Sequence, residues 1–226
     1  MAQIETNTAD REGALKVLRE WLTSPSADNT PASNSSLQLF TALLLMQDGN
    51  TKEAVKALQN GNTLEQKALL VQLYLKMDRA DVAGKVLKSM VSADEDSTLT
   101  QIASAWLHMA NGKSVEATYI FDELSDKHGD SSLLKNGSAV AKMQLGEFAD
   151  AESLLQDSLR TNPNDPDTLA NLIAVSQHLN KAPEVVNRYL KQLQNVAPSH
   201  QLVLSLATFE QAFDRVAATF AKGTKV

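Results

Sequence analysis

The chain has 226 residues, 43% of them hydrophobic and 21% charged, which excludes an intrinsically disordered chain and fits one or two globular domains. Its formal net charge is −6, so it lacks the basic excess with which proteins bind nucleic acid or anionic lipid. It contains no cysteine, which excludes disulfides, cysteine-ligated zinc and thiol catalysis.

The N-terminal segment is polar and has no apolar core of a secretory signal, and we expect residues 1–9 to be disordered. The stretch EGALKVLREWL has apolar residues at helical spacing, which predicts a helix at 12–22 whose hairpin partner is missing. A polar loop is expected at 23–36, where Ser, Asn and Pro are frequent. No apolar run reaches the ~18 residues of a membrane-spanning helix, so we expect no direct insertion into a membrane.

A 34-residue repeat occupies the chain from residue 64 onwards. Small or medium apolar residues recur at this spacing, and a large apolar residue follows each by four positions: Ala83 and Leu87, Ala117 and Phe121, Ala151 and Leu155, Val185 and Tyr189. Another apolar residue precedes each by twelve positions: Val71, Ala105, Ala139 and Ile173. This period is typical of tetratricopeptide (TPR) repeats, which are helical hairpins. The small residue lets the two helices of a hairpin approach closely.

Turn signals divide the repeat into helices. Polar segments inside the units (DRAD, NGKS, GEF, NKAP) alternate with others between units, and the units are predicted to start at Leu64, Thr98, Ser132 and Pro166. The carboxylates of DEDS (94–97) and NPNDPD (162–167) are interpreted as helix caps, because their spacing does not match a calcium loop. An irregular unit is predicted upstream, where Gly49, Ala54 and Leu58 repeat the pattern at a shorter spacing.

A last helix is predicted at 201–220. Its apolar residues form one stripe at spacings of three and four: Leu202, Leu206, Phe209, Phe213, Val216 and Phe220. We expect this stripe to close the open core of the last unit, and residues 222–226 to form a disordered tail. The sequence therefore predicts an all-α fold. Residues 10–221 would form an α-α superhelix, a TPR-like solenoid with a C-terminal capping helix.

Candidate partner-binding residues follow from this architecture, in which the first helix of each hairpin lines a concave groove. Counting along the units places eight residues in the middle of the groove: Leu99, Ile102, Trp106, Met109, Leu133, Asn136, Val140 and Met143. Apolar residues at such positions are typical of a slot for the apolar stripe of a partner helix, and Trp106 is the expected anchor. The alternative, that these residues pack as ordinary core, stays open.

No catalytic or metal-binding pattern accompanies the groove, so we expect a protein that is not an enzyme and has no cofactor. The four histidines, His108, His128, His178 and His200, do not form the two-histidine pair of a zinc-binding helix, and polar or interhelical contacts are expected for them. The groove also lacks the Lys and Arg cluster that grasps the carboxylate of a peptide tail.

Three stretches carry a resemblance to a known family. DEDSTLTQIASAWLHMANG (94–112), YIFDELSDK (119–127) and DPDTLANLIAVSQHLNKAPEVVNRYLKQL (165–193) closely resemble the epsilon subunit of coatomer. The similarity runs from about Gly13 to the C-terminus. Members of this family are longer at the N-terminus, where they carry further hairpins that this chain is expected to lack.

The resemblance implies a non-catalytic structural subunit of the coatomer (COPI) vesicle coat, in the cytoplasm and on the cytosolic face of Golgi membranes and COPI vesicles. It implies that the TPR groove binds and stabilises the C-terminal region of the alpha subunit in Golgi-to-ER and intra-Golgi transport, with the rest of coatomer as further partners. The alternatives are a generic TPR adaptor for short peptides of a chaperone or other complex, and a helper protein with a hidden metal site. Self-association through an exposed end of the array is also open.

Overall fold

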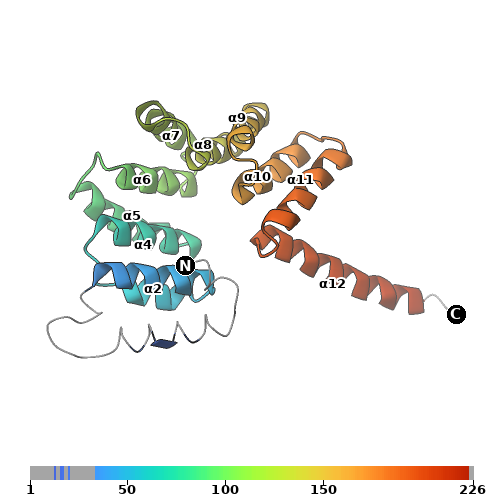
Figure 1. Cartoon of the computed structure of the whole chain (residues 1–226), viewed down its shortest axis with the longest axis horizontal. Coiled ribbons are helices and arrows are strands. Elements are labelled where there is room, and N and C mark those ends of the chain that lie inside the picture. Colours follow the sequence, from blue (N-terminus) through green and yellow to red (C-terminus); the bar gives the residue numbers. More distant parts are fainter. Residues whose placement is uncertain (1–12, 14–15, 18–19, 21–33, 224–226) are drawn as a thin grey trace. The chain divides into compact units, whose positions relative to one another are not determined.

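The computed structural model describes residues 13, 16–17, 20 and 34–223, and within these residues all regular secondary structure is helical (Figure 1). The helices are α2 (Ser35–Gln47), α3 (Thr51–Leu58), α4 (Leu64–Lys76), α5 (Ala80–Val91), α6 (Thr98–Ala110), α7 (Ser114–His128), α8 (Ser132–Gln144), α9 (Phe148–Thr161), α10 (Pro166–His178), α11 (Pro183–Val196) and α12 (Gln201–Gly223). The predicted disorder at 1–9 and most of the predicted helix at 12–22 lie outside the described residues.

The helices belong to two compact units, Met1–Lys113 and Ser114–Val226, called here the N-terminal and C-terminal units. In the N-terminal unit α2 pairs with α3 and α4 with α5, and α6 packs on α4 and α5. In the C-terminal unit α8 packs against both α7 and α9, and α10 packs against α8, α9 and α11. Antiparallel neighbours joined by short turns are therefore the building block of both units, as the hairpin pattern predicts.

The predicted starts of the repeats are confirmed. Helices α4, α6, α8 and α10 begin at Leu64, Thr98, Ser132 and Pro166. The residue before each start is a short polar one, and three of these four side chains cap their helix: Thr63 accepts from Gln66 N, Ser131 from Leu134 N, and Asp165 from Thr168 N. Ser97 makes no such bond, and the nearby Asp94 side chain accepts from Ser97 N instead. The interpretation of NPNDPD as a cap is thus confirmed at Asp165.

One turn recurs inside the hairpins. Residues in the left-handed region of backbone space stand at the same place in each: Gly49, Asp78, Gly112, Gly146 and Asn180. The following N–H reaches back five residues, as from Glu147 N to Lys142 O at 3.0 Å and from Lys181 N to Ser176 O at 3.0 Å. These are the bonds of a Schellman motif, which ends a helix by satisfying its last carbonyl groups. Gly, Asn and Asp are the residues that adopt this conformation most readily.

The small residues of the repeat occupy the helix contacts. Ala83, Ala117 and Ala151 are 0% exposed, and each begins the core-facing side of a second helix. The large residues one turn later fill the space beside them, since Phe121 and Leu155 are at most 1% exposed. The irregular upstream repeat behaves in the same way, since Ala54 and Leu58 of α3 are 0% exposed and pack with residues of α2 and α4. The periodic pattern thus marks the core.

The first residues of α2 differ from the expectation for the polar loop. Ser35 and Ser36 were predicted to lie in a loop at 23–36, but they form the first turn of α2. The reason is local, because the Asn34 side chain accepts hydrogen bonds from Ser36 N and Leu37 N and so caps the helix. Residues 23–33 lie outside the described part of the chain.

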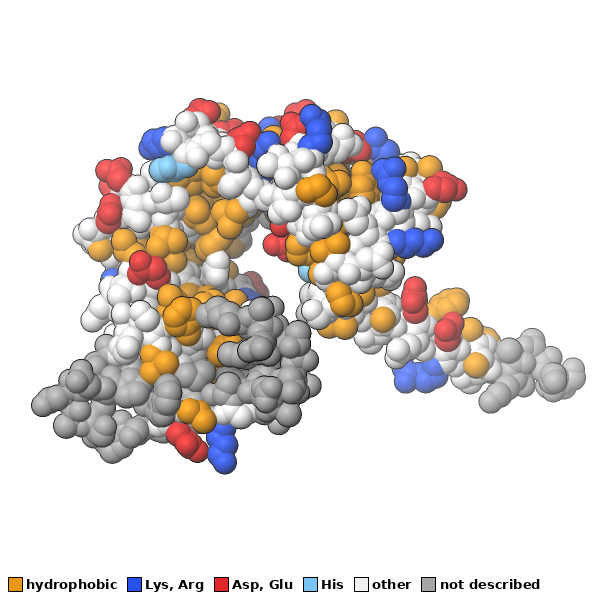
Figure 2. Space-filling model, in the orientation of Figure 1, with side chains coloured by type: hydrophobic (Ala, Val, Ile, Leu, Met, Phe, Trp, Pro, Cys, Tyr) orange, Lys and Arg blue, Asp and Glu red, His pale blue; other side chains and the backbone are white. Residues whose placement is uncertain are grey.

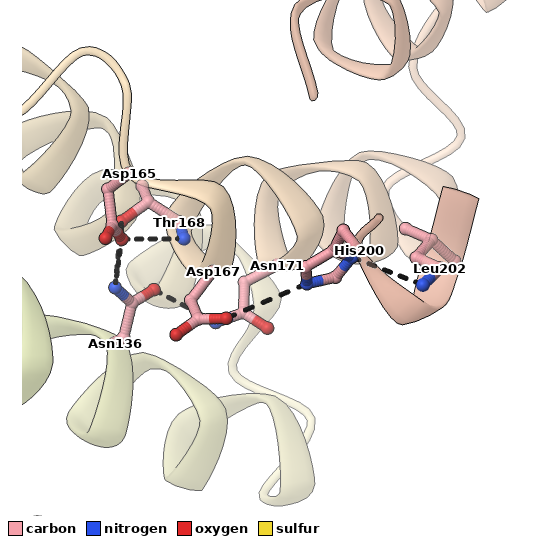
Figure 3. Close-up of polar contacts among 7 residues, drawn as sticks. All are labelled: Asn136, Asp165, Asp167, Thr168, Asn171, His200 and Leu202. Atoms are coloured by element: carbon pink, nitrogen blue, oxygen red, sulfur yellow. Dashed lines mark hydrogen bonds and ion pairs between the residues drawn. The ribbon is translucent and has the colours of Figure 1, made fainter. Parts of the chain in front are cut away.

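The terminal helix α12 closes the core of the C-terminal unit only with its first turn. Leu202 and Val203 pack against the cluster formed by α8 to α11. His200 fixes this start, because its Nδ1 accepts from Leu202 N at 3.2 Å and its Nε2 lies 3.8 Å from Asp167 Oδ1 of α10 (Figure 3). Beyond this turn the helix leaves the core, and Phe209 and Phe213 are 69% and 72% exposed. The expectation that the whole stripe closes the core is therefore wrong for these rings.

Candidate partner-binding surface

Four of the predicted partner-binding residues form one stripe along α6 in the N-terminal unit. Leu99, Ile102, Trp106 and Met109 follow one another at spacings of three, four and three, which places them on one face of the helix. Leu99 is exposed, and the other three are half-buried. Trp106 packs against the cluster of α4, α5 and α6 that contains Val71, Ala83 and Ala103. The ring therefore contributes to the core while part of it remains accessible.

The equivalent stripe of the C-terminal unit lies on α8. Leu133, Asn136, Val140 and Met143 stand 34 positions after the α6 residues, at the same spacings. Leu133 is 54% exposed, whereas Val140 and Met143 are half-buried. Met143 packs against the core cluster of α8 to α11. In both helices the stripe is thus most exposed at its N-terminal end, whereas its later residues are half-buried and pack partly against the core.

Asn136 is the exception in this stripe. Its side chain is buried, with 9% exposure, and lies against α10 rather than at the surface. Its Nδ2 donates to Thr168 Oγ1 at 2.8 Å and to Asp165 Oδ2 at 3.1 Å, and its Oδ1 accepts from Asn171 Nδ2 at 2.9 Å (Figure 3). Its Nδ2 also donates to Ser132 O at 2.8 Å, so both the NH2 group and the oxygen of the amide are engaged inside the C-terminal unit. We therefore remove Asn136 from the proposed partner-binding surface.

The contacts of Asn136 define a polar network that joins consecutive repeats. Asp165 caps α10 and holds Thr168, and the Thr168 hydroxyl lies 3.0 Å from Ser158 Oγ of α9. Thr168 and Ser158 are 0% exposed, so their hydroxyl groups are satisfied by one another and by the network. Buried polar groups paired in this way fix one packing arrangement, because any other register leaves them unpaired. The network therefore sets how α8, α9 and α10 fit together.

Sequence reasoning identified only one member of this network, Asp165. The signal that could have revealed the rest is the polar pair Asn136 and Asn171 in successive first helices, of which Asn136 stands at an inward position and Asn171 directly follows one. A polar side chain at an inward position, with an Asp-Pro helix cap in the next repeat, indicates a hydrogen bond between the two repeats. Counting solvent-facing positions alone treated Asn136 as free.

Other inward positions of α10 are occupied by His178 and by polar or small residues. The His178 ring stacks on Phe148 of α9, with 4.4 Å between ring centroids and 7° between planes. This is the interhelical contact expected for a histidine without ligand partners. The acidic Asp167 nearby is exposed, as is Glu65 at the inward side of α4 in the other unit. Neither is suited to bind an acidic peptide tail.

Among the described residues, a pKa shift belongs to an ion pair between Arg79 and Asp81. In the turn that joins α4 to α5, Arg79 donates two hydrogen bonds to the Asp81 carboxylate, at 2.9 and 3.0 Å. This side-chain hydrogen bonding lowers the pKa of Asp81 to about 2. The pair is solvent-exposed, so its contribution to the free energy of unfolding is small. Among the described residues no group of three or more His, Asp or Glu side chains is placed to hold a metal ion.

No helix in the described part of the chain is both long and apolar enough to cross a membrane. The longest, α12, has the amphipathic pattern reported above, and its polar residues include Glu210, Asp214 and Arg215.

Comparison with known proteins identifies the family. A profile described as "Coatomer epsilon subunit" matches residues 1–221, which is nearly the whole chain. The chain belongs to the coatomer epsilon subunit family. It is therefore a component of the COPI coat and of the machinery of protein transport, as the resemblance in its sequence implies.

Curated members of the coatomer epsilon family cover most of the chain. Coatomer subunit epsilon-1 of Arabidopsis thaliana is 40% identical over 223 residues, which are 98% of this chain and 74% of the relative. Coatomer subunit epsilon of Dictyostelium discoideum is 33% identical over 91% of this chain and 68% of its own length. This chain thus spans about three-quarters of the length of the plant relative.

Solved structures agree on the fold of this coatomer epsilon family member. A tetratricopeptide repeat protein from Parabacteroides merdae superposes with a TM-score of 0.76 at 16% identity, covering 90% of this chain and 79% of that one. A TPR protein from Thermus thermophilus gives a TM-score of 0.68 at 15% identity, covering 80% and 100%. At these identities the likeness concerns the fold alone, and it confirms the predicted TPR-like repeat.

Proposed function

We propose that this chain acts in coatomer as a non-catalytic scaffold that binds and stabilises the C-terminal region of the alpha subunit. It would do so in the cytoplasm and on the cytosolic face of Golgi membranes and COPI vesicles, in Golgi-to-ER and intra-Golgi transport. Family membership supports a place in the coat. The observation that carries the proposal is an apolar stripe on one helix of each unit, on α6 in the N-terminal unit and on α8 in the C-terminal unit.

Both stripes expose large apolar side chains, which are more stable against a partner than in water. Leu99 and Leu133 are the second residues of α6 and α8, and both are exposed although they are large and apolar. Ile102, Trp106 and Met109 continue one stripe, and Val140 and Met143 continue the other. Amphipathic segments of a partner commonly dock on such apolar stripes through a few large side chains. A permanent interface of this kind buries on the order of 2,000 Å² or more.

The alternative, an adaptor that binds short acidic peptide tails, is less well supported. Such a site needs Lys or Arg side chains that pair with carboxylates. At the inward positions of α4 and α10, Glu65 and Asp167 present the wrong charge, and both are exposed. The same acidic residues are compatible with an apolar partner segment that is flanked by basic residues.

The test is a titration of the purified chain with the C-terminal fragment of the coatomer alpha subunit. Trp106→Ala combined with Met143→Ala should weaken binding by tenfold or more, which corresponds to about 1.4 kcal/mol. Because both side chains also pack against the core clusters, this variant can lose stability as well as affinity.

A second variant separates the two effects. Leu133→Ser changes an exposed residue of the α8 stripe, and Val115→Ser changes a residue of similar exposure on α7, at 47%. Both should leave the unfolding temperature nearly unchanged. Only Leu133→Ser should weaken the alpha-subunit complex. Equal affinities for Leu133→Ser, Val115→Ser and the unaltered chain would remove α8 from the surface.

A further inference from the structure

The apolar face of α12 is a second surface, separate from the stripes on α6 and α8. After its first turn the helix carries Phe209 and Phe213 at 69% and 72% exposure and Val216 at 53%. Figure 2 shows hydrophobic side chains along the length of α12, which Figure 1 shows extending away from α11. Large exposed rings in a row are uncommon on a folded surface and mark sites of interaction.

The spacing of this stripe indicates the shape of its partner. From Leu202 to Phe220 the apolar residues follow one another at intervals of four, three, four, three and four. This is the alternation of heptad positions a and d, with an average of 3.5 residues. A seam of this kind is narrow and fits against the side chains of another α-helix. A helix that lies on a lipid surface has a wider apolar face and Lys or Arg beside it.

The two flanks of the stripe differ in a way that indicates the charge of the partner. On one side Glu210 and Asp214 stand beside the rings, and the four side chains of Phe209, Glu210, Phe213 and Asp214 line a shallow, open depression on the helix surface. Arg215 points farther round the helix and does not line it. A partner whose apolar residue packs against Phe209 and Phe213 therefore brings its neighbouring side chains close to two carboxylates, which favours Lys or Arg there.

The opposite flank is made of small residues. Ser205 and Ala212 lie on that side of the stripe, by the geometry of 100° per residue. Small side chains let a second helix approach closely without displacing large groups. The face from Leu206 to Val216 thus combines an apolar seam, one close-packing edge and one acidic edge.

We propose that residues 206–216 of α12 form a docking face for an amphipathic helix of another protein, apolar at its heptad a and d positions and basic along one edge. A second copy of this chain fits the face less well, because it would bring its own Glu210 and Asp214 to an acidic chain of net charge −6. The face is independent of the surface proposed for the alpha subunit.

The test uses the full chain and two synthetic helical peptides of three heptads, with Leu at a and d. One peptide carries Lys at e and g, and the other carries Glu at these positions. In fluorescence anisotropy the Lys peptide should bind at least tenfold more tightly than the Glu peptide. Phe209→Ser combined with Phe213→Ser should lower the affinity for the Lys peptide at least tenfold. Leu204→Ser is the matched control, because Leu204 is 51% exposed on the opposite side of α12.

A charge-reversal variant makes the test specific to the acidic edge. Glu210→Lys combined with Asp214→Lys should invert the preference, so that the Glu peptide binds more tightly than the Lys peptide. The proposal is overturned if the Lys and Glu peptides bind the unaltered chain with equal affinity. It is also overturned if Leu204→Ser weakens binding of the Lys peptide as much as the double Phe variant does. It is also overturned if the chain dimerises in sedimentation equilibrium and the double Phe variant does not. Binding to phosphatidylcholine vesicles that the double Phe variant loses would overturn it as well.

Discussion

Asn136 Nδ2 donates a hydrogen bond to Thr168 Oγ1 over 2.8 Å, and this bond joins the first helices of two consecutive repeats. Both residues are buried, so the bond lies in a region that excludes water. It belongs to the network through which α8, α9 and α10 find a single register. Removing it should therefore affect stability more than an average substitution.

Asn136→Ala should destabilise the C-terminal unit by about 1–3 kcal/mol, because it leaves buried polar groups on α10 without their partner. For a chain of this size that lowers the unfolding temperature by roughly 2–4 °C per kcal/mol. Differential scanning calorimetry measures the change. Asn171→Ala is the control, since the half-buried Asn171 donates one bond to this network and its loss should cost less. An Asn136→Ala protein as stable as the unaltered chain would show that the network contributes nothing.

Gly137 and Gly84 should respond to alanine in opposite directions. A Cβ at Gly137 would lie 2.5 Å from two atoms of the buried Phe121 ring, so Gly137→Ala should cost about 1–3 kcal/mol. A Cβ at Gly84 would meet only Leu107, at 3.7 Å. Since Gly84 lies inside α5, alanine should stabilise that helix by up to about 1 kcal/mol. Urea unfolding of the two variants measures the change in the free energy of unfolding for each. A change in the same direction for both variants would contradict the packing at these glycines.

The left-handed turn residues predict a second pair of opposite effects. Asn180 has φ of 50°, so Asn180→Gly should raise stability by a few tenths to about 1 kcal/mol. Gly146 stands at the same place in the preceding hairpin with φ of 82°, and Gly146→Ala should lower stability by about 1–2 kcal/mol. Thermal unfolding followed by circular dichroism is sufficient. Destabilisation by Asn180→Gly would be evidence that the asparagine side chain has another role.

Asp81 should titrate at unusually low pH. The Arg79 hydrogen bonds hold its pKa at about 2, below that of a free aspartate. A lowered pKa means that the pair contributes to stability above the unfolded-state pKa of about 4 and that this contribution is lost as the pH falls toward 2. Carbon-13 NMR of the Asp81 carboxylate reads the midpoint directly. In Arg79→Ala the midpoint should rise toward the ordinary range, and an unchanged midpoint would show that Arg79 is not the cause.

The periodic part of the fold could be predicted from sequence because it depends on local rules. The 34-residue spacing of Ala83, Ala117 and Ala151 marks buried positions of the second helices, and the caps and left-handed turns set the helix ends. Period and turn chemistry therefore located all four repeat starts. The unit boundary between α6 and α7 has no equivalent signal in the spacing.

The candidate surface was less predictable, because a position in a repeat does not say what the neighbouring repeat places against it. Asn136 counts as solvent-facing in its own repeat, but Asp165 and Thr168 of the next repeat bind it. In α12 the opposite occurs. The spacing of its apolar stripe predicts a buried face, but of the stripe only Leu202, near the start of the helix, packs against the core cluster of the described residues. In both cases the environment is set by residues distant in sequence, which periodicity cannot supply.

The most direct test of the central proposal places a photo-crosslinking phenylalanine analogue at single positions of the chain and maps crosslinks to the C-terminal fragment of the alpha subunit. Substitution at Leu99 or Leu133 probes the stripes, and substitution at Val115 or Tyr119 probes exposed positions of α7. The proposal predicts strong crosslinks from positions 99 and 133 and none above background from 115 and 119. Crosslinks from α7 alone, with none from α6 or α8, would contradict it.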